Sequence, residues 1–104
     1  MKLTQDEKCV LTLLDDAEVD GFEGLAQRYI QLPKKKIAEI VEKLKNLELV
    51  EIIFLADEKD LWYFHTGKVN EEMLDDDLRY KKNYGSDKPV LTSSEKLEKK
   101  ARFH

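Results

Sequence analysis

A run of three lysines, Lys34-Lys35-Lys36, has the residue types and spacing that most clearly suggest binding chemistry in this sequence. The run follows Pro33, and proline suits the first turn of a helix, where its missing N–H costs little. The three ammonium groups are therefore expected at the amino-terminal end of a helix. That end carries partial positive charge and free N–H groups, and it suits phosphate. The run is either a phosphate clamp or an ordinary solvated basic turn.

Other chemically active residue types occur without the spacing that catalysis or metal binding requires. Asp75-Asp76-Asp77 would lie about 100° apart from one another on a helix, so the three carboxylates cannot converge on one ion. His65 and His104 share no ligand spacing, and Cys9 falls in an apolar run, where a small buried hydrophobe is expected. The four glycines form no nucleotide-binding motif. The sequence therefore predicts no enzyme, no metal site and no cofactor.

The charge of the chain is unevenly distributed. The 104 residues include 18 Lys+Arg and 22 Asp+Glu, for a net charge of −4, which excludes a protein that coats nucleic acid by its overall charge. Two segments are nevertheless basic, and each has a net charge of +4: residues 28–46 and residues 81–104. Any contact with nucleic acid must therefore use a local basic patch.

The sequence also argues against membrane insertion and export. The longest apolar run, residues 52–56, is too short to span a bilayer. The first residues are polar and acidic, unlike a signal peptide, and a single cysteine allows no intrachain disulfide. We expect a cytoplasmic protein of one domain over residues 1–82. Residues 83–104 are expected to form a loop followed by a short helix or a flexible basic tail.

Hydrophobic periodicity predicts helices over residues 5–16, 22–30 and 33–47. Thr4 with Glu7, and Asp20 with Glu23, have the spacing of capping boxes for the first two. The third helix has the clearest apolar stripe, with these members: Ile37, Ile40, Val41, Leu44 and Leu47. Residues 49–55 and 61–65 then predict a β-hairpin, and residues 68–81 a fourth helix. The expected fold class is mainly α with a small antiparallel β-hairpin.

This order of elements resembles the winged helix-turn-helix domain. Residues 37–51 resemble the third helix of that domain running into its first wing strand, with Glu48 where many members have glycine. Phe64-His65-Thr66-Gly67-Lys68 is similar to the L-T-x-x-G-K segment that leaves the wing of MarR- and PadR-like regulators, though two residues shorter. The resemblance covers residues 3 to about 80. It implies a three-helix core, a wing, and DNA binding through the third helix in the major groove.

The resemblance and the charge pattern together predict a small transcriptional regulator that binds double-stranded DNA with helix 33–47. Lys34, Lys35 and Lys36 would hold phosphates. The other candidates for DNA contact are Arg28, Ala38, Glu39, Glu42, Lys43 and Lys59. Glu39 and Glu42 would repel phosphates, and ordinary i,i+4 pairs with lysines on a solvated face are the favoured interpretation for them.

The alternative is a winged-helix module for protein–protein contact that does not bind DNA. The wing tip, residues 57–60, has a net charge of −2, whereas wings that bind DNA usually carry basic residues. A protein partner would use this acidic wing or the aromatic strand 61–65. An apolar strip in the fourth helix also suggests a homodimer interface. Its members are Val69, Met73, Leu74, Leu78 and Tyr80.

Overall fold

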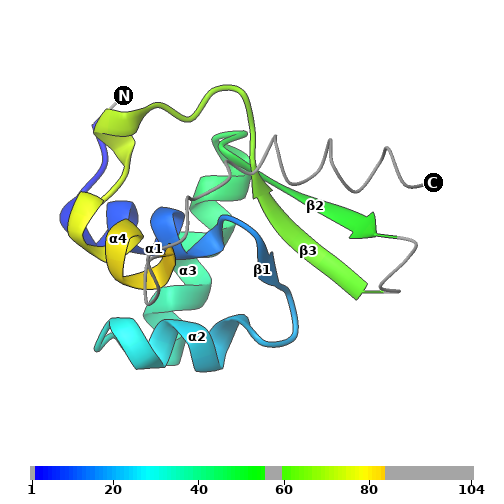
Figure 1. Ribbon diagram of the computed structural model, residues 1–104, viewed down its shortest axis with the longest axis horizontal. Coiled ribbons are helices and arrows are strands. Elements are labelled where there is room, and N and C mark those ends of the chain that lie inside the picture. The colour runs from blue at the N-terminus through cyan, green and yellow to red at the C-terminus, as the bar shows by residue number, and fades with distance from the viewer. Residues whose placement is uncertain (1, 56–59, 84–104) are drawn as a thin grey trace.

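The computed structural model describes residues 2–55 and 60–83, which form helices and one antiparallel sheet (Figure 1). The elements in chain order are α1 (Gln5–Leu14), β1 (Ala17–Glu18), α2 (Phe22–Tyr29), α3 (Lys34–Asn46), β2 (Val50–Leu55), β3 (Asp60–His65), a 3-10 turn η1 (Glu71–Met73) and α4 (Asp76–Asn83). The predictions for Asp57, Glu58 and Lys59 at the wing tip, and for the tail after residue 83, lie outside the described residues.

Helix α1 is the centre of the molecule. Its capping box is confirmed, because Thr4 Oγ1 accepts a hydrogen bond from the Glu7 N–H and the Glu7 carboxylate accepts one from the Thr4 N–H. The helix packs against α2, α3, α4 and β3. Val10, Leu11, Leu13 and Leu14 are therefore all fully buried. The helix ends at Leu14, two residues earlier than predicted.

Helices α2 and α3 begin and end within one residue of the predicted positions. The capping box predicted for α2 from Asp20 and Glu23 is wrong, because Gly21 occupies the N-cap and no side chain caps the helix. Pro33 is the N-cap of α3 and not its first helical residue. The apolar stripe of α3 faces the core as expected, with Leu47 only half-buried.

The hairpin of β2 and β3 is confirmed, and a third strand that the sequence did not predict joins it. The strand order is β1-β3-β2, with both pairs antiparallel. Between the first two predicted helices, Ala17 pairs with Tyr63 and Glu18 with Trp62. A strand of two residues has no measurable periodicity, so only its pairing with β3 identifies it.

The single helix predicted over residues 68–81 is wrong. Asn70 Oδ1 accepts a hydrogen bond from the Glu72 N–H at 3.1 Å and starts the 3-10 turn. Asp75 Oδ1 accepts one from the Leu78 N–H at 2.8 Å and starts α4. Asn and Asp side chains compete with helix hydrogen bonds in this way. The described residues thus form a small mixed α/β fold of four α-helices and a three-stranded antiparallel sheet.

Candidate nucleic-acid interface

The turn between α2 and α3 is flanked by four of the predicted basic residues, Arg28 before it and Lys34, Lys35 and Lys36 after it. Helix α2 ends at Tyr29 and α3 begins at Lys34. The connecting turn is held by a hydrogen bond of 2.8 Å from Gln27 Nε2 to the Leu32 carbonyl oxygen. Because the turn is short, Arg28 in the last turn of α2 lies close along the chain to the first turn of α3. The N–H groups of that first turn have no partner within the helix.

The basic side chains at this turn are exposed and nearly unpaired. Arg28, Lys34, Lys35 and Lys36 are all exposed. Lys34 Nζ lies 3.6 Å from Glu23 Oε2, and both side chains are more than 60% exposed, so this ion pair is weak. Within the residues that the structure describes, the other three cations form no ion pair within 4.0 Å. We call these four residues the basic turn.

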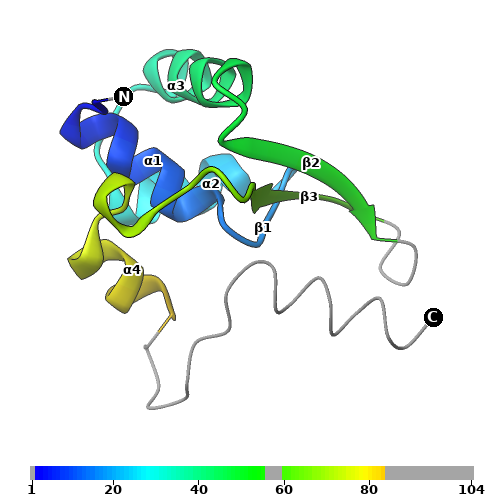
Figure 2. The ribbon, with the colours of Figure 1, turned by 90° about the horizontal axis from the view of Figure 1, so that it is seen from above.

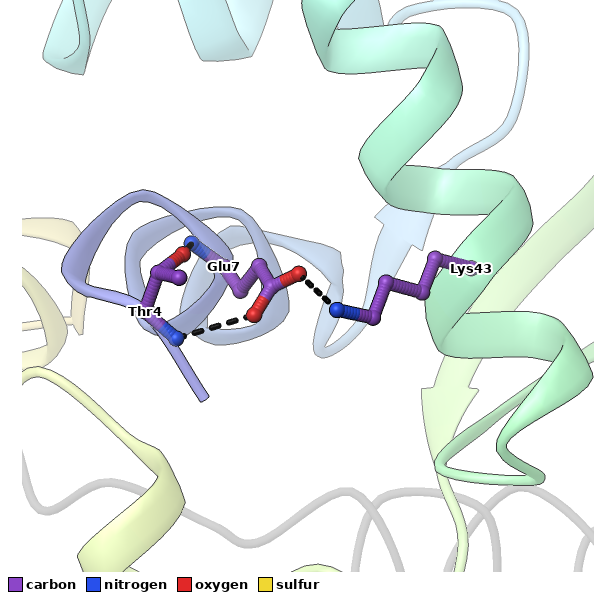
Figure 3. Close-up of polar contacts among 3 residues, drawn as sticks. All are labelled: Thr4, Glu7 and Lys43. Atoms are coloured by element: carbon purple, nitrogen blue, oxygen red, sulfur yellow. Dashed lines mark hydrogen bonds and ion pairs between the residues drawn. The ribbon is translucent and has the colours of Figure 1, made fainter. Parts of the chain in front are cut away.

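Lys43 differs from the basic turn because it is already engaged. Its Nζ lies 2.5 Å from Oε2 of Glu7 in α1, and Oε1 of Glu7 accepts the Thr4 N–H at 2.9 Å (Figure 3). Two hydrogen bonds hold the pKa of the Glu7 carboxyl below its ordinary value. The bond from Lys43 has the larger effect, and the bond from the Thr4 backbone N–H has the next largest. Lys43 thus pairs with α1 and not with Glu39, the carboxylate four residues before it on α3, and a phosphate would have to compete with Glu7 for it.

The exposed face of α3 carries the two predicted acidic residues. Ala38, Glu39 and Glu42 are exposed, as the helical wheel requires. Glu42 Oε2 lies 3.7 Å from Lys45 Nζ, an i,i+3 pair. The pKa of the Tyr63 hydroxyl in β3 is raised, mainly by burial and then by the negative charge of Asp20. The negative charge of Glu42 adds a smaller effect in the same direction. The middle of α3 is therefore less favourable to phosphate than its amino-terminal end.

The predicted dimer strip is largely covered by the protein itself. Leu78 is buried, and Val69, Met73 and Leu74 are half-buried against the core. Tyr80 is the member that stays exposed, at 61%. The segment is tied to α1 by a hydrogen bond of 2.9 Å from the Asp75 N–H to Thr12 Oγ1.

The aromatic strand also lies mostly inside the protein. Tyr63 and Phe64 are buried, Trp62 and His65 are half-buried, and Leu61 is exposed. Tyr63 packs edge-on against Phe22, with ring centroids 5.7 Å apart. His65 Nε2 lies 2.6 Å from the Leu11 carbonyl oxygen, so this ring fastens β3 to α1.

The hairpin carries an exposed apolar surface that was not predicted from the sequence. Ile52, Phe54 and Leu61 are large hydrophobic residues that remain exposed. Phe54 pairs directly with Leu61 across the two strands, and Ile52 lies on the same face. The alternation of residues 50–55 could have placed Ile52 and Phe54 on one face, but only the packing shows that the helices leave this face uncovered.

The described residues offer no site for a metal ion made of three or more His, Cys, Asp or Glu side chains. The helices in this part of the chain are all too short or too polar to cross a membrane. In the comparisons with known proteins, neither a family model, nor a curated protein, nor a solved structure matches this chain.

Proposed function

We propose that this chain is a small winged helix-turn-helix protein that binds double-stranded DNA as a regulator of transcription. The element order α1-β1-α2-α3-β2-β3, with an antiparallel sheet, supports the winged-helix resemblance. In that arrangement α3 enters the major groove with its amino-terminal residues foremost.

The observation that carries the proposal is the basic turn. Four exposed cations gather where α2 ends and α3 begins, and only Lys34 has an ion-pair partner among the described residues. The N–H groups of the first turn of α3 add partial positive charge at the same place. This combination suits backbone phosphates, which position a helix on the duplex before any base is contacted.

The test is binding of a labelled DNA duplex across a salt series. If four cations displace counterions, log K should fall with log salt at a slope of about −3.6, which is roughly a hundredfold loss between about 50 and 200 mM. Lys34→Ala/Lys35→Ala/Lys36→Ala should reduce that slope to about −0.9, because one cation remains.

A matched control separates the basic turn from charge in general. Lys2, Lys68 and Lys81 are exposed lysines outside α3. The triple variant Lys2→Ala/Lys68→Ala/Lys81→Ala removes the same net charge and should keep the slope of the unmodified protein. Equal losses in the two triple variants would show that the basic turn is not the contact.

A second candidate function is contact with another protein, without DNA. It is favoured by the exposed carboxylates of Glu39 and Glu42 in the middle of the α3 face, since these repel phosphate. Absence of duplex binding at low salt by the folded protein would contradict the DNA proposal and favour this candidate.

A further inference from the structure

The exposed apolar side chains of the hairpin lie together on one face. Phe54 is 58% exposed, Leu61 49% and Ile52 39%. The register places Phe54 opposite Leu61, and it places Ile52 opposite Tyr63, which is buried in the core. Figures 1 and 2 show β2 and β3 extending beyond the helices towards the segment that joins them. The helices therefore cover this face only near the start of β2, and we call its exposed part the wing patch.

Strand β2 also forms an edge of the sheet, with β3 as its neighbour. The Thr66 N–H donates to the Leu49 carbonyl at 3.0 Å, so Leu49 turns its backbone groups toward β3. The N–H and C=O groups of successive residues point to opposite sides of a strand, so those of Glu51, Ile53 and Leu55 also point toward β3. The N–H and C=O groups of Ile52 and Phe54 therefore point away from β3. In the described part of the chain, no further strand forms hydrogen bonds with these outward-pointing groups.

This edge lacks the features that usually keep an edge strand unpaired. Proteins protect such edges with lysine, proline, bulges or very short strands. The other edge of this sheet, β1, has only two residues. Strand β2 has six residues, Val-Glu-Ile-Ile-Phe-Leu, with no proline, no lysine and a single charged residue, Glu51. It is paired to β3 without interruption from Val50 to Leu55.

We propose that β2 pairs antiparallel with β2 of a second copy of this chain, about a two-fold axis at Ile53. In this register Ile52 of each copy lies opposite Phe54 of the other, and these residues exchange the outward-facing hydrogen bonds. The two wing patches then join into one apolar surface. The carboxylate of Glu51 lies opposite Leu55, so the two copies place no like charges directly opposite each other in the strand pair. A closed, self-complementary contact of this kind is the commonest form of homodimer.

The size of the patch sets the expected strength of the dimer. If a large apolar side chain offers about 200 Å², the exposed fractions of the three residues leave roughly 290 Å² per copy. Two copies then bring roughly 580 Å², little more than half of the ~1,000 Å² expected for a specific interface. Backbone pairing and neighbouring side chains must supply the remainder. A reversible dimer that dissociates on dilution is therefore expected.

The first experiment measures the mass of the full chain in solution over a wide range of concentration. The mass should rise from 12.2 kDa toward twice that value as concentration increases. Phe54→Lys should abolish this rise, because it places a charge in the joined apolar surface. Tyr80→Lys is the matched control, since it makes the same kind of change at the other large aromatic residue that is exposed among those the structure describes, and it should leave dimerisation intact. Circular dichroism checks that both variants are folded.

The second experiment tests the register by disulfide trapping. With Cys9→Ser removing the native thiol, Ile53→Cys should form a disulfide-linked dimer under mild oxidation, because the two Cα atoms lie opposite each other within disulfide range. Ile52→Cys should not cross-link, since its counterpart lies two residues away. A monomer at every concentration, dimer loss with Tyr80→Lys alone, or cross-linking at residue 52 in place of 53 would each overturn the proposal.

Discussion

Glu7 links the start of α1 to α3, and among the described residues it is the charged residue that is buried. Its side chain is only 8% exposed, yet Thr4 and Lys43 satisfy both of its oxygens. Lys43 keeps 54% of its own side chain exposed, so water weakens the attraction between the charges. The stability of the fold therefore depends more on the hydrogen bonds to the Glu7 carboxylate than on the Coulomb attraction between the charges, because a buried oxygen without a hydrogen-bond partner lowers the free energy of unfolding.

Replacing Glu7 should therefore lower stability in a pH-dependent way. Because folding lowers the pKa of Glu7, its contribution is fully present above the unfolded-state pKa and disappears as pH falls through the folded-state pKa. Glu7→Gln should lose about 1–2 kcal/mol of unfolding free energy at neutral pH. The difference between the two proteins should shrink in acid. Urea denaturation at several pH values measures both effects.

A surface carboxylate provides the comparison for this prediction. Glu48 also has a lowered pKa, caused mainly by its hydrogen bond with Lys68, but its side chain is 70% exposed. Glu48→Gln should change stability very little, because water screens an exposed pair. If Glu7→Gln were as mild as Glu48→Gln at neutral pH, the burial of the Glu7 carboxylate would not be important for stability.

The same contact explains why the sequence could predict only part of the candidate interface. The basic turn follows from local sequence, since a lysine run after Pro33 is readable without a structure. The ion pair of Lys43 with Glu7 cannot be predicted in this way, because the two residues lie 36 positions apart in the sequence and meet only through the packing of α1 on α3. Exposure of Phe54 likewise depends on how far the hairpin extends beyond the helices.

At the scale of elements, the sequence predicted the features that depend on residues close together along the chain. The apolar stripe of α3 predicted the position of that helix and its buried face, and the capping box of Thr4 predicted where α1 begins. The sequence failed where a side chain competes with the helix backbone, at Asn70 and Asp75, and where a strand exists only through its partner, at Ala17. These outcomes depend on contacts between distant segments, which periodicity does not contain.

The end of α3 holds a residue in the left-handed backbone conformation. Glu48 follows the last residues of the helix and has φ of 60°. The Leu49 N–H bonds the Leu44 carbonyl and the Glu48 N–H bonds the Lys45 carbonyl, which together form a Schellman motif. Glycine adopts this left-handed conformation without the strain that a side chain introduces. The glutamate is therefore strained at this position.

Glu48→Gly should stabilise the protein, by up to about 1 kcal/mol, because it removes left-handed strain at the cost of some unfolded-state entropy. Thermal unfolding measures the change. Glu48→Ala is the control, since it removes the contact with Lys68 while keeping the strained conformation, and it should not stabilise. Stabilisation by both variants would mean that the carboxylate is unfavourable for another reason and that strain is not the cause.

At the scale of the whole molecule, charge is separated across the fold. Figure 2 shows α1 between α3 on one side and α4 on the other. The basic turn lies at the α3 side, whereas Glu71, Glu72, Asp76 and Asp77 are exposed around the start of α4. A duplex bound at α3 would therefore be attracted by nearby cations and repelled by carboxylates farther away. Salt concentration decides how far each of these forces extends.

This separation predicts a curved salt dependence for DNA binding. At about 10 mM salt the Debye length is ~30 Å, so the carboxylates around the start of α4 act on the duplex as well. At about 150 mM the length is ~8 Å and only the basic turn acts. The plot of log K against log salt should thus flatten below about 50 mM, departing from the straight line of counterion release. Glu71→Gln/Glu72→Gln/Asp76→Asn should straighten it by raising affinity at low salt alone. A straight line for the unmodified protein down to the lowest salt would show that the acidic side does not act on bound DNA.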